Sequence, residues 1–144
     1  MLNRSLCEGC PIAGDYRPIE SKGPTDARFL IVTDVPSQAA GKQDRLLTDK
    51  QMATLAGELM DQGFSREDFR FTPVCHCAYD PNLYPNKVKS AIHKHCRQHF
   101  LAEVDENRPE VVVPLGAEAA THAFGRATKI TKVRGLPHEI DGLS

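Results

Sequence analysis

Five cysteines are the residues of this 144-residue chain whose type and spacing most directly suggest chemistry. Cys7 and Cys10 have the C-x2-C spacing that lets two thiolates from one tight turn reach the same metal centre. Cys77 and Cys96 lie much further along the chain and far from each other. An odd number of cysteines, in a chain that begins without an export signal, argues against a disulfide framework. It favours metal ligation or redox chemistry in a reducing compartment.

Four thiolates suit either Zn²⁺ or an iron–sulfur cluster. The second pair lacks C-x2-C spacing, so a zinc ribbon fits poorly, whereas a cluster accepts ligands that the fold gathers from distant segments. Alternation along an expected strand places the fifth cysteine, Cys75, on the same face as Cys77. Cys75 therefore either replaces Cys77 as a ligand or belongs to the core. In a purely structural interpretation, Cys75, Cys77 and Cys96 are all small buried hydrophobes.

Four histidines lie near these cysteines in the sequence, and they have structural explanations. We expect His93 to be solvated, and His95 and His99 to pack on one face of a helix. The alternative is that a histidine replaces one thiolate, as it does in some clusters. The four are His76, His93, His95 and His99.

The elements that must position these residues alternate between strands and helices. The predicted strands, read from continuous apolar runs, are residues 27–33, 69–75 and 110–116. The predicted helices, read from apolar side chains at helical spacing, are residues 49–62, 85–104 and 117–124. Thr48 is the expected N-cap of the first helix and Gly63 its stop. The first 25 residues and residues 41–47 are expected to be irregular. This alternation predicts a parallel sheet covered on both faces.

Composition limits the class of protein. Hydrophobic residues make up 40% and charged residues 26% of the chain, as in ordinary globular domains, and 144 residues are enough for one domain. No apolar run approaches the roughly 20 residues of a membrane span, and the N-terminus lacks the apolar core of a signal peptide. We therefore expect no membrane association and a cytoplasmic location. The net charge of -1 means that any attraction to nucleic acid must be local.

A basic turn near the end of the chain is the candidate for such an attraction. Lys132 and Arg134 flank Val133 just before Gly135, and Arg126 and Lys129 precede them. Ligands usually bind at the carboxyl edge of the sheet in α/β folds, and a glycine lets the backbone approach a phosphate. We expect Lys132, Arg134 and Gly135 to contact DNA, the alternative being an ordinary solvated face.

Taken together, these segments resemble the uracil-DNA glycosylase superfamily, and specifically its iron–sulfur branch, family 4. The matching parts, in chain order, are Cys7-x2-Cys10, residues 27–36, residues 59–68, residues 72–77, Cys96, residues 109–116 and residues 130–135. The cysteine set and the segment from Lys132 to Gly135 are the more specific of these. The resemblance covers nearly the whole chain.

The resemblance implies a three-layer α/β/α fold with a four-stranded, mainly parallel sheet. It implies a 4Fe-4S cluster, with zinc as the alternative, held by Cys7, Cys10, Cys77 and Cys96. The family carries a Gly-Glu-Ala-Pro-Gly loop after the first strand, where this chain has Asp34. Asp34 would orient a water or stabilise an oxocarbenium-like sugar; otherwise it is a turn residue at the strand end.

Several departures from the family pattern affect the base pocket. Thr33 and Ser37 replace the loop glycines, Leu46 falls near the aromatic that stacks on uracil, and Pro73 replaces the asparagine that reads the edge of uracil. The family's His-Pro-Ser loop lies beyond the matched segments, and the chain stops at Ser144 before it could occur. A flipped base would lose its stacking platform, its reader and one wall of its pocket.

Family-4-like domains with such losses also resemble the N-terminal appendage of some bacteriophage family-A DNA polymerases. We therefore expect residues 1–144 to form one glycosylase-like iron–sulfur domain that is truncated at its C-terminal end. We expect this domain to associate with DNA, to be degenerate in uracil excision and to belong to a replication polypeptide of a bacterium or a phage-infected cell. The main alternative is an active uracil-DNA glycosylase that hydrolyses the N-glycosidic bond in base-excision repair. A third class is a zinc or redox protein unrelated to DNA, which the basic turn disfavours.

Overall fold

Strands and helices alternate along the chain in the computed structural model, which describes residues 2–124. The strands are β1 (Phe29–Thr33), β2 (Phe69–Pro73) and β3 (Val111–Pro114). The α-helices are α1 (Gln38–Lys42), α2 (Asp49–Asp61), α3 (Asn86–Asn107) and α4 (Ala117–Phe124). Short 3-10 helices are η1 (Arg4–Cys7), η2 (Arg66–Asp68) and η3 (Pro81–Leu83). None of the helices within this part of the chain combines the length and the apolar character needed to cross a bilayer.

The three strands form one parallel sheet in the order β2-β1-β3. Ile31 in the central strand pairs with Phe71 on one side and Val113 on the other. We expected four strands, and residues 2–124 contribute three. The expected fourth strand came from the family resemblance alone, because the described residues hold no further apolar run of strand length. The predicted α/β class and the parallel pairing are confirmed.

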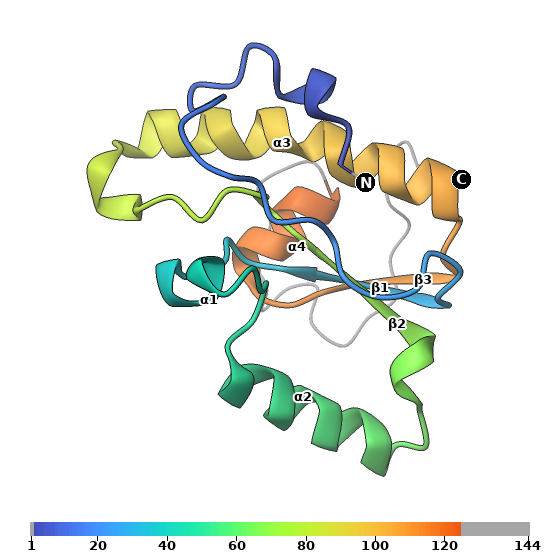
Figure 1. Ribbon diagram of the computed structural model, residues 1–144. Helices are drawn as coiled ribbons and strands as arrows, with labels where there is room; N and C mark the ends of the chain where they lie inside the picture. The colour runs from blue at the N-terminus through green and yellow to red at the C-terminus, as the bar shows by residue number, and fades with distance from the viewer. Residues whose placement is uncertain (1, 125–144) are drawn as a thin grey trace.

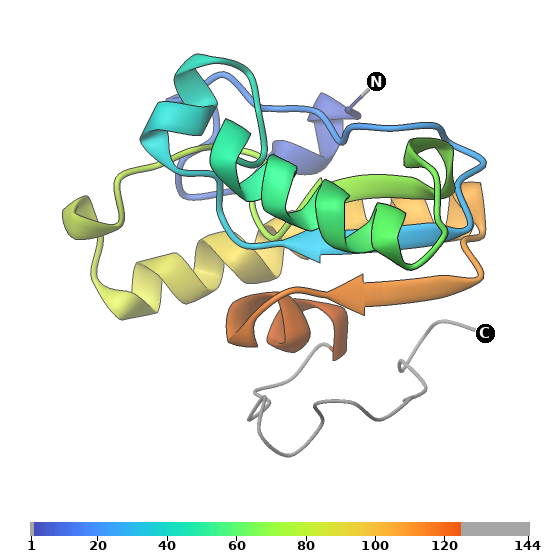
Figure 2. The same ribbon diagram turned by 90° about the horizontal axis from the view of Figure 1, so that it is seen from below.

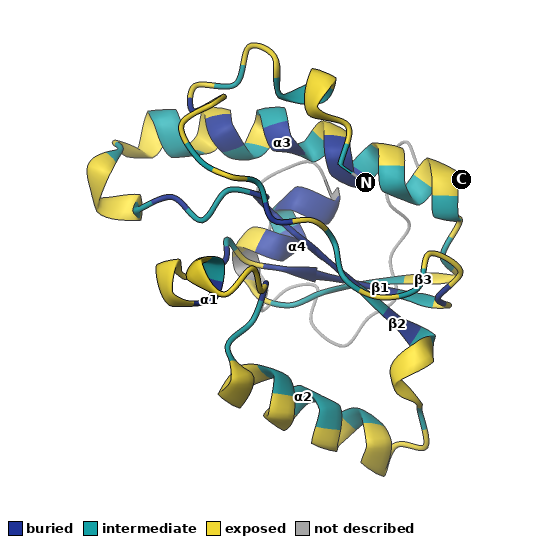
Figure 3. Cartoon of the chain, in the orientation of Figure 1, coloured by how far each residue is buried: buried dark blue, intermediate teal, exposed yellow. Residues whose placement is uncertain are grey.

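Helices cover both faces of the sheet (Figures 1 and 2). Leu30 and Val32 of β1 pack with Phe100 of α3 and with Ala119 and Ala123 of α4 on one face. Ile31 packs on the other face, where the apolar side of α2 closes a cluster around Phe71. Side chains alternate across a strand, so this central strand is buried on both sides, as Figure 3 shows.

Local capping rules explain where the helices α1 and α2 begin. Thr48 and Gln51 form a capping box at the start of α2, and Gly63 follows its end at φ +87°. The predicted helices over residues 49–62 and 85–104 are confirmed, although α3 continues to Asn107. The predicted loop over residues 41–47 is partly wrong, because the Ser37 side chain caps the short helix α1.

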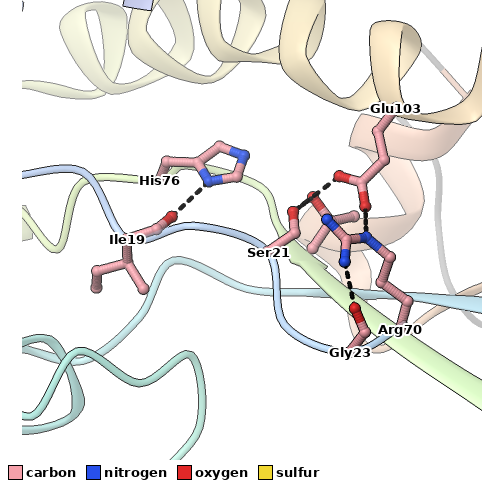
Figure 4. Close-up of polar contacts among 7 residues, drawn as sticks. Ile19, Ser21, Gly23, Arg70, His76 and Glu103 are labelled. Atoms are coloured by element: carbon pink, nitrogen blue, oxygen red, sulfur yellow. Dashed lines mark hydrogen bonds and ion pairs between the residues drawn. The ribbon is translucent and has the colours of Figure 1, made fainter. Parts of the chain in front are cut away.

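The N-terminal segment adds to the free edge of β2 in the antiparallel direction. Lys22 pairs with Phe71 through two backbone hydrogen bonds of 2.9 and 2.7 Å, and the Ile19 N–H donates to the His76 carbonyl at 2.6 Å. Side chains strengthen the attachment, since Glu103 of α3 forms an ion pair with Arg70 and accepts a hydrogen bond from Ser21 at 2.8 Å (Figure 4). An antiparallel partner of β2 carries the extreme N-terminus to the carboxyl end of that strand.

Two helical glycines offer a matched test of this packing. A Cβ on Gly41 of α1 would lie 2.6 Å from the Cβ of Ala78, whereas a Cβ on Gly57 of α2 meets nothing within 4 Å. Gly57→Ala should raise the free energy of unfolding by about 0.5–1 kcal/mol, through helix propensity. Gly41→Ala should lower it by about 1–3 kcal/mol, through overpacking. Urea titration of both variants measures the difference, and equal stabilisation by the two would contradict this packing of α1.

Candidate functional site

All five cysteines line one small cavity. The cavity lies between the N-terminal turn, the segment that follows β2, and the middle of α3. Cys75 and Cys96 are almost fully buried, at 2% and 8% exposure, and the other three are half-buried. The four sequence-predicted ligands therefore meet at one place, with the fifth cysteine beside them.

The N-terminal pair is presented by a tight turn that is anchored to α3. The Cys10 N–H donates to the Cys7 carbonyl at 3.0 Å, and Gly9 between them has φ +89°. The His95 ring of α3 lies 3.0 Å (Nε2) from the Leu6 carbonyl, and a Cβ on Gly9 would come within 3.4 Å of that ring. Glycine thus permits both the turn and its close approach to the helix.

The second group of cysteines is fixed through the intervening His76. Its backbone N–H donates to Cys96 Sγ at 3.4 Å, and its ring Nδ1 lies 2.6 Å from the Ile19 carbonyl (Figure 4). The Cys75 thiol donates to the Cys77 carbonyl at 3.4 Å. One residue therefore connects β2, the N-terminal segment and α3.

The electrostatics of the cavity depend on burial and on sulfur–sulfur contacts. Burial raises the pKa of Cys7 and of Cys10, and the nearby Cys96 and Cys77 raise both further. The hydrogen bond from Cys75 lowers the pKa of Cys77 and of Cys96. A metal cation would reverse the first effect by replacing the protons, so metal binding here must release protons.

The donor set distinguishes between kinds of metal group. Within residues 2–124, no three or more histidine, cysteine or acidic side chains converge closely enough for a single ion. A zinc site needs four ligands around one point, at about 2.3 Å for sulfur. Four thiols gathered around a cavity from separate segments of the chain would suit an iron–sulfur cluster. The residues that could hold it are Cys7, Cys10, Cys77 and Cys96.

The neighbouring histidines have specific partners. His99 is buried, with its Nε2 3.4 Å from Cys7 Sγ, and burial lowers the pKa of His76 and of His99 to about 4. The prediction that His93 is solvated is wrong, because it is half-buried with its Nε2 2.6 Å from the Tyr79 hydroxyl. Tyr79 comes from the loop after β2, which sequence periodicity could not place against α3.

A second group of polar residues lies at the carboxyl edge of the sheet. Asp34 follows β1 and Gly116 follows β3, the two strands between which the strand order reverses. Such a reversal is where α/β folds bind ligands. The Asp34 carboxylate lies against Gly116, since a Cβ there would be 3.2 Å from Oδ2, and Gly116 has φ +100°.

Asp34 also lies close to the start of the adjacent helix, α4. Its carboxylate is stabilised by the Ala119 backbone N–H, in the first turn of α4, and His93 lies near enough to favour its charged form. Partial burial and the neighbouring Glu118 carboxylate outweigh these effects and raise the pKa of Asp34. Sequence reasoning missed Glu118 and the Tyr79–His93 pair near Asp34.

Comparison with known proteins identifies the family. The family model of the Uracil DNA glycosylase superfamily matches residues 20–140. The chain belongs to this superfamily. It is 29% identical over 133 residues to the type-4 uracil-DNA glycosylase of Thermotoga maritima, covering 91% of this chain and 68% of that protein. It is 26% identical over 129 residues to the DNA polymerase of Bacillus phage SP01, covering 88% of this chain but only 13% of the polymerase. The predicted resemblance to the superfamily is confirmed, and so are the predicted similarities to a type-4 glycosylase and to a phage DNA polymerase.

The residues that depart from the glycosylase pattern have structural roles in this member of the superfamily. Leu46 is 5% exposed and packs in the core with Ile31 and Phe71, so its side chain offers no stacking surface. Pro73 is fully buried at the end of β2. Lys132, Arg134 and Gly135 lie outside the described residues.

A buried histidine of this glycosylase-superfamily domain predicts acid sensitivity. His122 of α4 is 4% exposed, and burial, with a contribution from Arg97, lowers its pKa to about 3. Below about pH 6.5, the ordinary pKa of histidine, His122 is protonated in the unfolded chain but stays neutral in the folded chain. The free energy of unfolding therefore decreases as the pH falls, by about 1.4 kcal/mol per pH unit. Between pH 6.5 and 5, the parent should lose about 2 kcal/mol more unfolding free energy than His122→Leu. Urea titrations at both pH values test this, and parallel losses in the two proteins would refute it.

Proposed function

We propose that this chain is an iron–sulfur domain of the glycosylase superfamily that associates with DNA, has lost efficient uracil excision and works as part of a larger replication polypeptide. The observation that carries the proposal is a contrast between two sites. The cysteines are gathered around one cavity, whereas two positions expected to contact uracil are occupied by buried core residues. The match to a phage DNA polymerase supports the larger polypeptide.

In this proposal Cys7, Cys10, Cys77 and Cys96 ligate a 4Fe-4S cluster. When bound, the cluster would supply iron–thiolate bonds that join the N-terminal turn, the segment after β2 and α3. Contacts within the protein hold these cysteines in position. His76 sets Cys96 and the N-terminal segment in place, and His95 holds the turn between Cys7 and Cys10.

Loss of excision follows from what a flipped base requires. An extruded base is held by stacking and by hydrogen bonds to its polar edge. Leu46 is aliphatic and buried, and Pro73 has neither an amide side chain nor a backbone N–H. Asp34 keeps a carboxylate at the edge of the sheet, where burial and the neighbouring Glu118 raise its pKa.

An active uracil-DNA glycosylase is the second candidate, and the position of Asp34 favours it. Asp34 lies where the strand order reverses, with His93 and Glu118 close by. In that case Asp34 would orient the attacking water or stabilise the oxocarbenium-like sugar, and its raised pKa would require the reaction to be run above that pKa.

The cluster proposal predicts coloured protein. Protein purified without chelators should be brown, with broad absorbance near ~400 nm and four irons per chain, as thiolate-ligated iron implies. Cys10→Ser and Cys96→Ser should bleach it and lower its stability, because metal binding is coupled to folding. Cys75→Ser is the matched control and should keep the colour. Colourless protein with stoichiometric zinc would refute the cluster. Bleaching by Cys75→Ser but not by Cys77→Ser would show that Cys75, and not Cys77, is the third ligand.

The activity proposal predicts little or no uracil release. Single-stranded and mismatched DNA containing uracil should remain intact after incubation and alkaline cleavage, because the base has neither stacking platform nor reader. Asp34→Asn is the informative variant, since it keeps the shape of the side chain and removes its charge. Rapid excision by the parent that Asp34→Asn abolishes would establish the second candidate instead.

The DNA proposal predicts weak, salt-dependent binding by the basic turn. We expect affinity on the order of micromolar or weaker at physiological salt, because the attraction is local. Lys132→Ala and Arg134→Ala should each weaken binding about equally across sequences and lower the salt slope by about one. Fluorescence anisotropy over a salt series measures both. Unchanged binding in both variants, or no salt-dependent binding by the parent, would favour a protein partner.

A further inference from the structure

The loop between β2 and α3 presents an isolated apolar side chain near its tip. Leu83, the last residue of the short helix η3, is 67% exposed. Figures 1 and 2 show this loop projecting beyond the carboxyl ends of the strands. Ligands bind at this edge in α/β folds, and Asp34 follows β1 at the same edge.

Contacts on both sides of Leu83 hold the loop in a defined shape. On one side, the Asp80 carbonyl accepts a hydrogen bond from the Leu83 N–H at 3.1 Å, and the Asp80 side chain caps η3. On the other side, the Tyr84 hydroxyl lies 3.0 Å from the Tyr16 hydroxyl, and the Tyr84 ring packs edge-to-face against Tyr79. Because the backbone is already fixed, covering Leu83 with a partner costs little conformational entropy.

Two lysines follow the exposed leucine at the start of α3. Lys87 is exposed and Lys89 is half-buried, and neither forms an ion pair with another residue in the described part of the chain. The first turn of α3 holds no acidic residue, and the one carboxylate within residues 80–89 is the Asp80 side chain that caps η3. Residues 80–89 therefore combine a net positive charge with an apolar side chain at the tip.

We propose that residues 80–89 form a second DNA-contact surface, besides the basic turn, in which Lys87 and Lys89 bind phosphates of single-stranded DNA and Leu83 packs against the face of an unstacked base. The inference rests on the DNA association of the proposed function. It adds to that function a place on the fold and a preference for single strands.

The preference for a single strand follows from the apolar side chain. Stacking covers the faces of the bases in a duplex, whereas a single strand exposes them, and every base has such a face. Leu83 gains by leaving water against one of them, while the lysines supply a local attraction to phosphate. A protein partner would need a contiguous apolar patch. The exposed residues next to Leu83 offer none, since they are Pro81, Asn82, Pro85 and Asn86.

The first test measures binding of the complete chain to fluorescein-labelled oligothymidylate, by anisotropy over a salt series. Leu83→Ser should weaken binding by about 3- to 10-fold, the effect of burying part of a leucine side chain, and leave the salt slope unchanged. Lys87→Ala and Lys89→Ala should each lower the salt slope by about 0.7. Binding to a duplex of the same length should not respond to Leu83→Ser.

Met60 offers the matched control for the exposed leucine. It is 70% exposed, but it lies near the end of α2, which leads through η2 into the start of β2 and so to the opposite edge of the sheet. Met60→Ser should bind both DNA probes like the parent.

A second measurement detects the base contact directly. The chain contains no tryptophan, so Leu83→Trp introduces a single indole fluorophore. Oligothymidylate should quench its emission, because a base stacks on the ring. Met60→Trp, with its fluorophore at the opposite edge, should not be quenched.

The outcomes separate this inference from the proposal on which it depends. A parent that binds neither probe would overturn the DNA association itself. A parent that binds DNA with a salt dependence that the Leu83, Lys87 and Lys89 variants leave unchanged would overturn this surface alone, and would assign the exposed leucine to a protein partner. Equal weakening of single-strand and duplex binding by Leu83→Ser, with no quenching of Leu83→Trp, would overturn the contact with an unstacked base.

Discussion

Thiols from three separate parts of the chain must meet in one cavity, and this requirement governs how the rest of the molecule is arranged. The antiparallel attachment of the N-terminal segment to β2 meets it most directly. Because Lys22 pairs with Phe71 and Ile19 with His76, the chain before them runs toward the carboxyl end of β2, where Cys75 and Cys77 lie. The length of α3 then supplies Cys96 and a scaffold for the N-terminal turn.

Gathering these thiols in a buried cavity has an electrostatic cost, which is smallest while the groups stay neutral. Burial and mutual proximity raise the pKa of Cys7 and of Cys10, and the buried His76 and His99 stay uncharged near neutral pH. A largely uncharged pocket of thiols and imidazoles costs little in the folded chain, and in the proposed function it would bind metal once the thiol protons leave. Folding and metal binding are therefore expected to support each other.

The sequence was sufficient where local rules decide the structure. Apolar runs located all three described strands, and Thr48 and Gly63 marked the limits of α2. It failed at α1, where Ser37 looked like part of a turn and Gly41 disfavoured a helix. It also failed at His93, whose partner Tyr79 is brought to it by tertiary folding. Cysteine spacing indicated which residues meet, but the attachment of Ile19 to His76 that brings them together has no local signature.

Three of the departures from the glycosylase pattern, at residues 37, 46 and 73, share a physical direction. Ser37 caps α1, Leu46 enlarges the apolar core, and Pro73 ends β2 without a polar side chain that would need a partner. The neighbouring backbone remains satisfied, because the Val74 N–H donates to the Thr33 carbonyl at 2.8 Å. A base pocket must keep glycines, an exposed aromatic ring and a buried amide that are poorly paired until substrate arrives, and each of these weakens the fold. Under the proposed loss of excision, replacement of such residues by capping and core residues stabilises the fold.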